Sequence, residues 1–396
     1  MRRKALNHME NKEQRGIGLC LAFKGANYGA LLQSFATQYQ LDKRGIYSEV
    51  LDYTRGKTNK YIFSPEAFLF LSVKKLWMFF DAKFAKQPVL DELHRRNKAE
   101  RAEIAKDFCR RRLHNIVKLN GYDELTAHAA TYKAVMVGSD QLWPPDVSFS
   151  NYLSLMFAPA GVRRISYATS TGVAKYPWFV YRQARVFLNK IDFLSVREQA
   201  GYEIIKKITG RDAKVVCDPT YLIPKAEWEE LIEKKEVVES GYVFSFFLGC
   251  NEKMKRLVRQ YADAHGLRVV CILSNEVVED DSFYADEILT GKTPEEFINL
   301  IRHAECVFTD SFHAFTFSVI NEKEVYVSYR VKKGVRPRNQ RIDNIVRKFG
   351  VENRLVKDPE HYVFDDKPID YARVTAAVDA FRAESAAFLD SAVVGC

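Results

Sequence analysis

The stretch Cys306-Val-Phe-Thr-Asp-Ser-Phe-His-Ala-Phe315 passes from one apolar run into another through a short polar step. Residues 304–308 are small and apolar, which predicts a short buried strand, and residues 312–320 predict the first turns of a helix. Asp and Ser between these runs are typical helix N-cap residues. A helix N-terminus behind a parallel strand favours a bound anion. We therefore expect His313 to lie beside an anion pocket.

The same change from strand to helix recurs along the chain. Strands are predicted at residues 17–23, 47–52, 134–137, 164–168, 193–196 and 214–217, and again at 242–248, 268–273, 304–308 and 324–329. Strands that alternate with helices are typical of parallel sheets, and 396 residues are too many for one typical core. The sequence therefore predicts an α/β protein of two Rossmann-like domains with a cleft between them, an architecture of the glycosyltransferase-B type.

Changes of composition predict the domain boundaries. We expect residues 1–15 to form a flexible tail, residues 16–220 the N-terminal domain and residues 221–370 the C-terminal domain. Aromatic-rich and charged helical patterns over about residues 54–130 interrupt the alternation and predict a helical insertion in the first domain. The Ala-rich, periodic segment 371–396 predicts a C-terminal helix that packs back on the N-terminal domain.

The net charge and the cysteine content limit which ligands and which cellular compartment are expected. The net charge of +9 and the pI near 9.0 suit a phosphate-bearing substrate, a nucleic acid or a membrane surface. The seven cysteines are scattered without a CxxC pair, which predicts reduced core residues in a cytoplasmic protein and gives little support to a metal site. Residues 1–15 lack the apolar core of a signal peptide. Charged residues interrupt the apolar stretch 61–84, so we expect no transmembrane helix.

The basic segment 94–114 has two interpretations. Charge runs usually coat exposed helices, which favours a solvated helical insertion. The alternative is a patch for an acidic or lipid-phosphate acceptor. We expect no nucleic acid, because no aromatic stacking motif is interleaved with the charges.

Small polar or charged residues follow several predicted strands at their C-terminal ends. They are the motifs Gly138-Ser-Asp-Gln141, Thr169-Ser-Thr-Gly172 and Arg197-Glu198. Asn27-Tyr-Gly29 follows the first strand but matches neither GxGxxG nor a Walker loop, so it predicts no dinucleotide or nucleoside triphosphate site. In open α/β sheets ligands bind outside these strand ends. We therefore expect the motifs to line one cleft.

Six motifs in order carry a resemblance to a known family. They are Asn27-Tyr-Gly-Ala-Leu-Leu-Gln33, Val137-Gly-Ser-Asp-Gln-Leu-Trp143, Ser166-Tyr-Ala-Thr-Ser-Thr-Gly172, Ser195-Val-Arg-Glu198, Asp218-Pro-Thr220 and Thr309-Asp-Ser-Phe-His313. From about residue 18 to about residue 350 the chain resembles the polysaccharide pyruvyl transferase family. The resemblance implies a glycosyltransferase-B fold and transfer of pyruvate from phosphoenolpyruvate to a sugar as a ketal. Thr171 and Ala314 depart from the family pattern without removing a reactive group.

Three residues suit the chemistry that the resemblance implies. Arg197 can hold a planar carboxylate or phosphate with its forked guanidinium, although an ion pair with Glu198 is the structural alternative. His313 can give a proton to the phosphate or to the methylene carbon.

Asp140 is the candidate base or anchor for sugar hydroxyls, and nearby Trp143 is either a stacking platform for the sugar or a core residue. Asp310 is expected to be a cap rather than a catalytic group.

The residues at these strand ends are expected to bind substrate. Gly29 is expected to let its helix approach closely. Arg338 and Arg341 are expected either to reach an anionic substrate or to lie in a solvated loop. The expected substrate-binding positions are Asn27, Tyr28, Gly29, Gly138, Ser139, Gln141, Ser170, Ser311, Phe312, Arg338 and Arg341. We expect no metal and no cofactor, with phosphoenolpyruvate as the donor.

The expected partner is a glycan or lipid-linked oligosaccharide acceptor, which would bring the enzyme to the inner face of the membrane. One alternative is a glycosyltransferase of the same fold with a nucleotide-sugar donor. The other is a polyanion or membrane-surface binding protein that acts through the basic segment 94–114. The sequence does not indicate the acceptor sugar or the oligomeric state.

Overall fold

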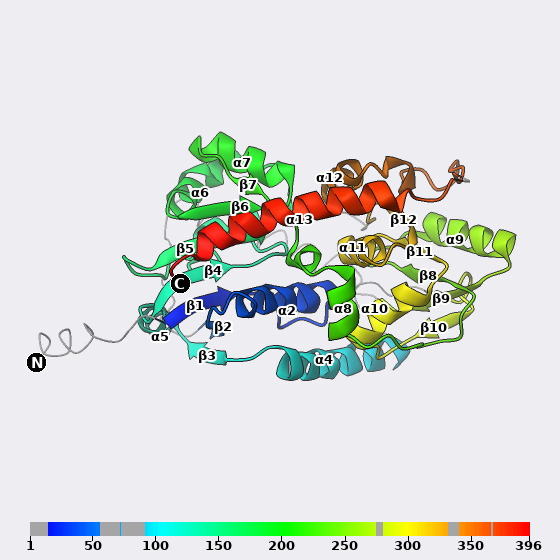
Figure 1. Ribbon diagram of the computed structural model, residues 1–396, viewed down its shortest axis with the longest axis horizontal. Coiled ribbons are helices and arrows are strands. Elements are labelled where there is room, and N and C mark those ends of the chain that lie inside the picture. Colours follow the sequence, from blue (N-terminus) through cyan, green and yellow to red (C-terminus); the bar gives the residue numbers. More distant parts are fainter. Residues whose placement is uncertain (1–14, 56–71, 73–91, 275–279, 332–339, 366) are drawn as a thin grey trace, which may run out of the picture.

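Two parallel sheets, each covered by helices, make up the protein (Figure 1). The computed structural model describes residues 15–55, 72, 92–274, 280–331, 340–365 and 367–396. The long helix α13 (Tyr371–Val393) runs across the molecule from the second sheet to the first. The α/β class with two Rossmann-like domains is therefore confirmed.

The N-terminal sheet has seven strands in the order β3-β2-β1-β4-β5-β6-β7. Its strands are β1 (Arg15–Cys20), β2 (Ser48–Thr54), β3 (Ile116–Asn120), β4 (Tyr132–Val137), β5 (Arg163–Thr169), β6 (Phe193–Val196) and β7 (Lys214–Val215). Every pairing is parallel, with Ile17 opposite Ala134 in the central pair. Because helices cover both faces, the central strands are almost continuously apolar and buried.

The C-terminal sheet has six strands in the order β10-β9-β8-β11-β12-β13. They are β8 (Tyr242–Phe246), β9 (Arg268–Ile272), β10 (Glu287–Leu289), β11 (Cys306–Thr309), β12 (Glu324–Ser328) and β13 (Leu355–Val356). All pairings are parallel here too. In both sheets the chain order reverses between two central strands, β1 and β4 in the first and β8 and β11 in the second. Such reversal points are where α/β sheets bind ligands.

Five of the described helices begin at a polar side chain that caps a free N–H group. The described helices are α2 (Tyr28–Asp42), α4 (Glu92–Arg112), α5 (Tyr122–Ala129), α6 (Tyr181–Leu188), α7 (Gln199–Thr209), α8 (Lys225–Leu231), α9 (Glu252–His265), α10 (Pro294–His303), α11 (Phe312–Ile320), α12 (Gln340–Phe349) and α13. The five capped helices are α2, α9, α10, α11 and α13. Asn27 caps α2 and Ser311 caps α11. Thr293 forms a reciprocal capping box with Glu296 at α10.

The region expected to be a helical insertion differs from the prediction. Within 54–130, the described part contains α4 but then returns to the sheet, because β3 pairs with β2 and α5 follows it. Strand β3 is an edge strand whose residues are mostly half-buried or exposed, so its sequence lacks a clear apolar run. Residues 56–71 and 73–91 of the expected insertion lie outside the described residues.

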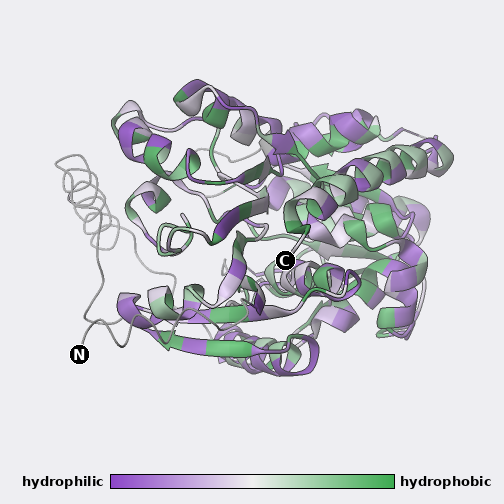
Figure 2. Cartoon of the chain, turned by 60° about the vertical axis from the view of Figure 1, so that its left-hand side comes forward, coloured by the Kyte–Doolittle hydropathy of each residue, from purple (hydrophilic) through white to green (hydrophobic). Residues whose placement is uncertain are grey.

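One hydrophobic core continues from the first domain into the second. Leu31 and Phe35 of α2 belong to the same buried cluster as Phe297 of α10 and Phe315 of α11. Tyr28 stacks on Phe297 with ring centroids 4.8 Å apart. Figure 2 shows hydrophobic and hydrophilic residues alternating along the helices. Helix α2 therefore packs as part of both domains.

Helix α13 contacts the N-terminal domain over its second half. The Ser385 hydroxyl accepts a hydrogen bond from the backbone N–H of Cys217, at 2.8 Å. Arg382 Nε donates to the Tyr221 carbonyl at 2.6 Å, and Arg163 donates to the Ala392 carbonyl at 3.0 Å. The start of the helix is held by the C-terminal domain, where the Tyr371 hydroxyl donates to the Lys323 carbonyl. No helix among the described residues has the length and apolarity needed to cross a membrane.

Candidate active site

The carboxyl ends of the two pairs of central strands supply the candidate site. The loops after β1 and β4 carry Asn27, Gly29 and the motif 138–141, and the loop after β11 carries residues 310–313. Parallel strands bring such loops to one edge of a sheet. The turn after β7 adds Asp218, which caps the short 3₁₀ helix η3 (Pro219–Leu222).

Asp218 lies at the centre of this group and its side chain is fully buried. Its Oδ2 accepts a hydrogen bond from Arg197 Nη1 at 2.7 Å and another from the Ser139 hydroxyl at 2.7 Å. His313 Nε2 lies 3.5 Å from the same oxygen. The structure thus joins three residues that the sequence predicted separately through one carboxylate that it did not assign.

The surroundings of Asp218 hold it in the ionised form. Burial alone would raise the pKa of Asp218, but the pKa is lowered far below its usual range. The charge and contact of His313 oppose the effect of burial most, followed by the charge of Arg197 and the hydroxyl of Ser139. A buried carboxylate with this many partners is stable as an anion, and it can orient the imidazole beside it.

His313 is also fixed from the opposite side by Gly29. A Cβ atom added to Gly29 would lie 2.0 Å from His313 Nδ1, far inside contact distance. Gly29 stands in the first turn of α2 and His313 in the first turn of α11, so this contact joins the two domains. The close approach that the sequence suggested for Gly29 therefore has a definite partner.

Arg197 and Arg341 have buried guanidinium nitrogens that make no hydrogen bond to a described residue. Arg197 is buried, its guanidinium lies 4.3 Å from the centre of the Phe312 ring, and its Nε and Nη2 make no hydrogen bond with any described residue. Arg341 Nε is likewise without a hydrogen bond within the described chain. Burial and then the charge of Arg197 lower the pKa of Arg341 to about 10. Two such cations side by side favour binding of an anion.

A cavity of about 310 Å³ opens beside these two arginines. Its walls come from the start of α7, the start of α11, helix α12 and helix α13, and they include Arg197, Glu198, Phe312, Arg341 and Phe381. Residues from both domains and from the C-terminal helix thus meet around one cationic space.

Glu198 is a second acidic residue of the site. Its Oε1 accepts from the Ser170 hydroxyl at 2.5 Å and from the backbone N–H of Thr171 at 3.2 Å. Its Oε2 lies 3.8 Å from Arg197 Nε and makes no hydrogen bond to a described residue. The ion pair between Arg197 and Glu198 that was the structural alternative is therefore present but long, and the stronger partner of Arg197 is Asp218.

Asp140 occupies an unusual backbone conformation at the end of β4. Its φ of +80° is in the left-handed region, which a non-glycine residue adopts at a cost. Its Oδ1 accepts from the backbone N–H of Gln141 at 2.8 Å, and its carbonyl accepts from Ser170 N–H at 2.9 Å. Gly138 has no room for a side chain, because an added Cβ would lie 2.5 Å from Leu21. The turn 138–141 is therefore shaped tightly against β5.

Three aromatic or polar side chains lie elsewhere than in the cavity. The Tyr28 hydroxyl donates to the Lys292 carbonyl at 2.8 Å and its ring is packed between the domains. Trp143 is fully buried and donates to the Leu153 carbonyl, so it is a core residue and not a stacking platform. The Asn27 side chain accepts from Ala30 N–H as the cap of α2.

Two further expectations concern the late basic and acidic residues. Asp310 does not cap α11, a role that Ser311 takes, but accepts from the backbone N–H groups of Leu248 and Gly249 and so fixes the loop after β8. Arg338 lies outside the described residues. Among the described residues, no group of three or more His, Cys, Asp or Glu is arranged to hold a metal ion.

The basic helix α4 is largely occupied by its own ion pairs. Arg96 pairs with Glu100 at 2.7 Å and Arg110 pairs with Asp107 at 2.6 Å. Arg111 bridges to Glu295 of α10 at 2.9 Å. This pattern matches the interpretation of a solvated helix better than that of an open cationic patch.

Comparison with solved structures shows the fold type. A UDP-N-acetylglucosamine 2-epimerase is similar with a TM-score of 0.53, 10% identity, and coverage of 96% of this chain and 95% of that chain. The epimerase from Neisseria meningitidis bound to UDP-GlcNAc (TM-score 0.48, 8% identity, 96% and 99% covered) is a weaker match. The heptosyltransferase WaaC of E. coli is weaker again (TM-score 0.36, 14% identity, 86% and 99% covered). The fold is of the glycosyltransferase-B type.

The family follows from the sequence itself. Residues 27–330, most of the chain, match the family described as polysaccharide pyruvyl transferase. No curated protein sequence gives a match. The chain belongs to the polysaccharide pyruvyl transferase family, which is a family of transferases, and the resemblance carried by the six motifs is confirmed.

Proposed function

We propose that the protein transfers pyruvate from phosphoenolpyruvate to two hydroxyl groups of a sugar and releases phosphate. One observation supports this reaction above all. Arg197 and Arg341, which have N–H groups without a hydrogen bond to a described residue, line one cavity. Arg197 also binds Asp218, whose Oδ2 lies 3.5 Å from His313 Nε2. A donor with two anionic groups needs such cations, and its methylene carbon needs a proton donor within reach.

In this proposal the cationic side of the site binds the donor. The unsatisfied nitrogens of Arg197 and Arg341 bind its carboxylate and phosphate, and the N-terminus of α11, capped by Ser311, adds backbone N–H groups. Binding of an anion removes the repulsion between the two guanidinium groups, which is the effect that contributes to lowering the pKa of Arg341.

The proton transfers are assigned to His313 and the acidic residues. His313, oriented by Asp218, protonates the methylene carbon of the donor. Asp140 and Glu198 accept hydrogen bonds from the two sugar hydroxyls as these attack the adjacent carbon, which bears the carboxylate and the phosphate oxygen. Two C–O bonds form and the bond from carbon to the phosphate oxygen breaks. One hydroxyl proton balances the proton gained by the methyl group, and the other leaves with phosphate.

The remaining parts of the proposal come from the family and the composition. We propose a glycan or its lipid-linked precursor as the acceptor, no cofactor, and a cytoplasmic location at the inner face of the membrane. The net charge of +9 supports an anionic donor or acceptor.

Phosphate release from phosphoenolpyruvate in the presence of a sugar acceptor tests the reaction. We expect His313→Ala and Arg197→Lys to lower kcat/KM by at least about 100-fold, since Lys cannot reproduce the guanidinium fork. Arg256→Gln is the control, because Arg256 pairs with Glu252 on the exposed face of α9. Full activity of both site variants would overturn the assignment.

Asp140→Gly separates chemistry from folding. Glycine adopts a φ of +80° without strain, so the variant should keep or raise the melting temperature while losing the carboxylate. We expect turnover to fall by about 100-fold with little change in the KM for phosphoenolpyruvate. Unchanged turnover would remove Asp140 from the mechanism.

Calorimetric titration distinguishes the donor class. Phosphoenolpyruvate should bind the wild type and bind Arg197→Lys more weakly, whereas UDP-sugars should not bind. Tight binding of a nucleotide sugar without binding of phosphoenolpyruvate would instead support a glycosyltransferase.

A further inference from the structure

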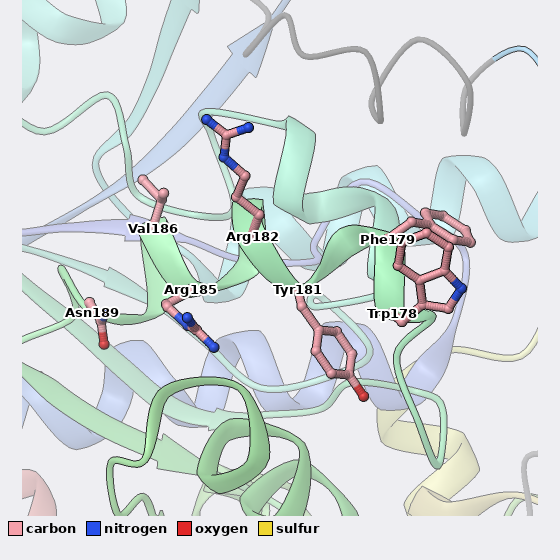
Figure 3. Close-up of a pocket in the computed structure, with 7 residues that line it drawn as sticks. All are labelled: Trp178, Phe179, Tyr181, Arg182, Arg185, Val186 and Asn189. Atoms are coloured by element: carbon pink, nitrogen blue, oxygen red, sulfur yellow. The ribbon is translucent and has the colours of Figure 1, made fainter.

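A second surface, which shares no residue with the cavity of the candidate site, carries aromatic and cationic side chains. We call it the α6 face. It is a hollow of about 570 Å³ lined by Trp178, Phe179, Tyr181, Arg182, Arg185, Val186 and Asn189 (Figure 3). Trp178 and Phe179 belong to the 3₁₀ helix η2 (Trp178–Val180) at one end of the hollow, and Asn189 follows α6 at the other.

The α6 face exposes apolar side chains that a helix surface usually hides. Trp178 is 80% exposed and Val186 is 43% exposed. The opposite side of α6 packs in the core. Phe187 and Leu188 are buried there, and the ring centroids of Phe187 and Trp143 lie 5.4 Å apart in an edge-to-face arrangement. Packing of α6 therefore does not explain why Trp178 and Val186 face solvent.

The cations that line this face are Arg182 and Arg185. Residues 147–191, which include the face, contain no Asp or Glu, and Lys175 and Lys190 are exposed within this segment. The neighbouring helix α7 adds Lys207, whose Nζ lies 5.7 Å from the centre of the Tyr181 ring. Asp212, which follows α7, is paired with Lys206 at 2.8 Å.

We infer that the α6 face docks the protein on the headgroup layer of an anionic lipid bilayer. Exposed Trp and Tyr settle at the interface between headgroups and acyl chains. Cations add attraction to anionic lipids, and binding strengthens with both buried apolar area and charge. The α6 face has both features, because Trp178 and Tyr181 line it together with Arg182 and Arg185.

A sugar polymer fits this surface less well. Carbohydrate hydroxyls are held by carboxylates and amides that accept and donate hydrogen bonds. The residues that line the α6 face include no carboxylate and one amide, Asn189. Residues 172–177 connect this face in sequence to Ser170 and Thr171, which donate hydrogen bonds to Glu198 of the candidate site.

Sedimentation with lipid vesicles tests the inference on the full chain. Vesicles of phosphatidylcholine with about one-third phosphatidylglycerol are compared with pure phosphatidylcholine. We expect the wild type to bind the anionic vesicles, and the double variant W178S/R182Q to lose about tenfold in partition coefficient. Activity on a water-soluble acceptor should be unchanged, since neither residue lies in the candidate site.

A matched control removes the effect of overall charge. F283S/R256Q deletes another exposed aromatic residue, 44% exposed, with an arginine 5.6 Å over its ring on the other domain. This control should bind vesicles like the wild type. Equal loss in both double variants would mean that net charge alone drives binding, and it would overturn the inference.

Tryptophan fluorescence gives an independent readout. The chain has four tryptophans, of which Trp143 and Trp228 are fully buried and Trp77 lies outside the described residues. In a W77F background, a blue shift on adding anionic vesicles should therefore come from Trp178 and disappear in W77F/W178F. Absence of any shift would contradict docking by this face. Binding of a soluble glycan at the face without vesicle binding would also overturn the inference and would support an acceptor site instead.

Discussion

Gly29 and His313 form the tightest contact between side chain and backbone in the candidate site. Glycine in a helix normally lowers the stability of the helix, and replacement by alanine raises it. Here the space that alanine needs is already occupied by the imidazole, at 2.0 Å from the added carbon. The residue type at position 29 is therefore set by a histidine that is distant in sequence.

Gly29→Ala should displace His313 and lower turnover by about 100-fold, because a shift of about 1 Å in a catalytic group has effects of that size. Gly25→Ala is the control, since nothing lies within 4 Å of its added carbon. Steady-state kinetics of both variants check the expectation. Normal turnover in Gly29→Ala would mean that the histidine can move without consequence.

Asp218 should make stability depend on acid in a specific way. Its pKa in the folded state is lowered, so its contribution is fully present above the unfolded-state pKa of about 3.9 and is lost as pH falls toward the folded-state value. Asp218→Asn removes this group. The difference in free energy of unfolding between wild type and variant should shrink below pH 3.9 by roughly 1.4 kcal/mol per pH unit.

Denaturant unfolding of both proteins between pH 6 and pH 3 measures this difference, because the other carboxylates titrate in both and cancel. A difference that stays constant over this range would show that the folded-state pKa of Asp218 is ordinary.

The residues that sequence reasoning found and missed differ in their surroundings. Arg197 and His313 stand in motifs at strand ends, so their place could be predicted. Asp218 was quoted for its motif but had no role, because a lone Asp before Pro is typical of a cap, and it does cap η3. The sequence left Trp143 between a stacking platform and a core residue and assigned Tyr28 to substrate binding, because the burial of both depends on elements far away in sequence.

Helix α13 is the element that ties the candidate site to the end of the chain. The hydroxyl of Ser385 satisfies the backbone N–H of Cys217, the residue before Asp218. This N–H is buried, so no water can replace the lost partner without cost. The position of Asp218 thus depends on a helix that begins more than 150 residues later.

Ser385→Ala should lower the free energy of unfolding by about 1–3 kcal/mol, the cost of an unsatisfied buried donor. Ser391→Ala is the matched control in the same helix, because its hydroxyl donates to the Phe388 carbonyl at an exposed site and its loss should matter by under about 0.5 kcal/mol. Chemical denaturation compares them. Equal losses of unfolding free energy in the two variants would show that the hydrogen bond from Cys217 to Ser385 contributes no more than an exposed one.

Elements with strong apolar patterns were predicted well and weak ones were not. The central strands β1, β4, β8 and β11 are buried on both faces and read as apolar runs. Strands β3, β10 and β13 lie toward or at the sheet edges and are short or half-exposed, so their sequences carry little signal.

At the scale of the whole molecule, the continuous core predicts how the domains unfold. Residues of α2 pack on α10 and α11 within one hydrophobic cluster, and α13 spans both domains. Two domains joined in this way should unfold together. We expect a single transition in differential scanning calorimetry with equal calorimetric and van't Hoff enthalpies. Two resolved transitions would show that the domains are independent.

The cavity of about 310 Å³ at the junction of both domains and α13 has a consequence for inhibitor design. A compound with a dianionic head for Arg197 and Arg341 and an aromatic tail for Phe312 and Phe381 would touch three separately encoded parts of the chain at once. Such a compound need not resemble a sugar. It would hold the two domains and α13 together, and its selectivity would come from the shape of their junction rather than from the chemistry of the reaction.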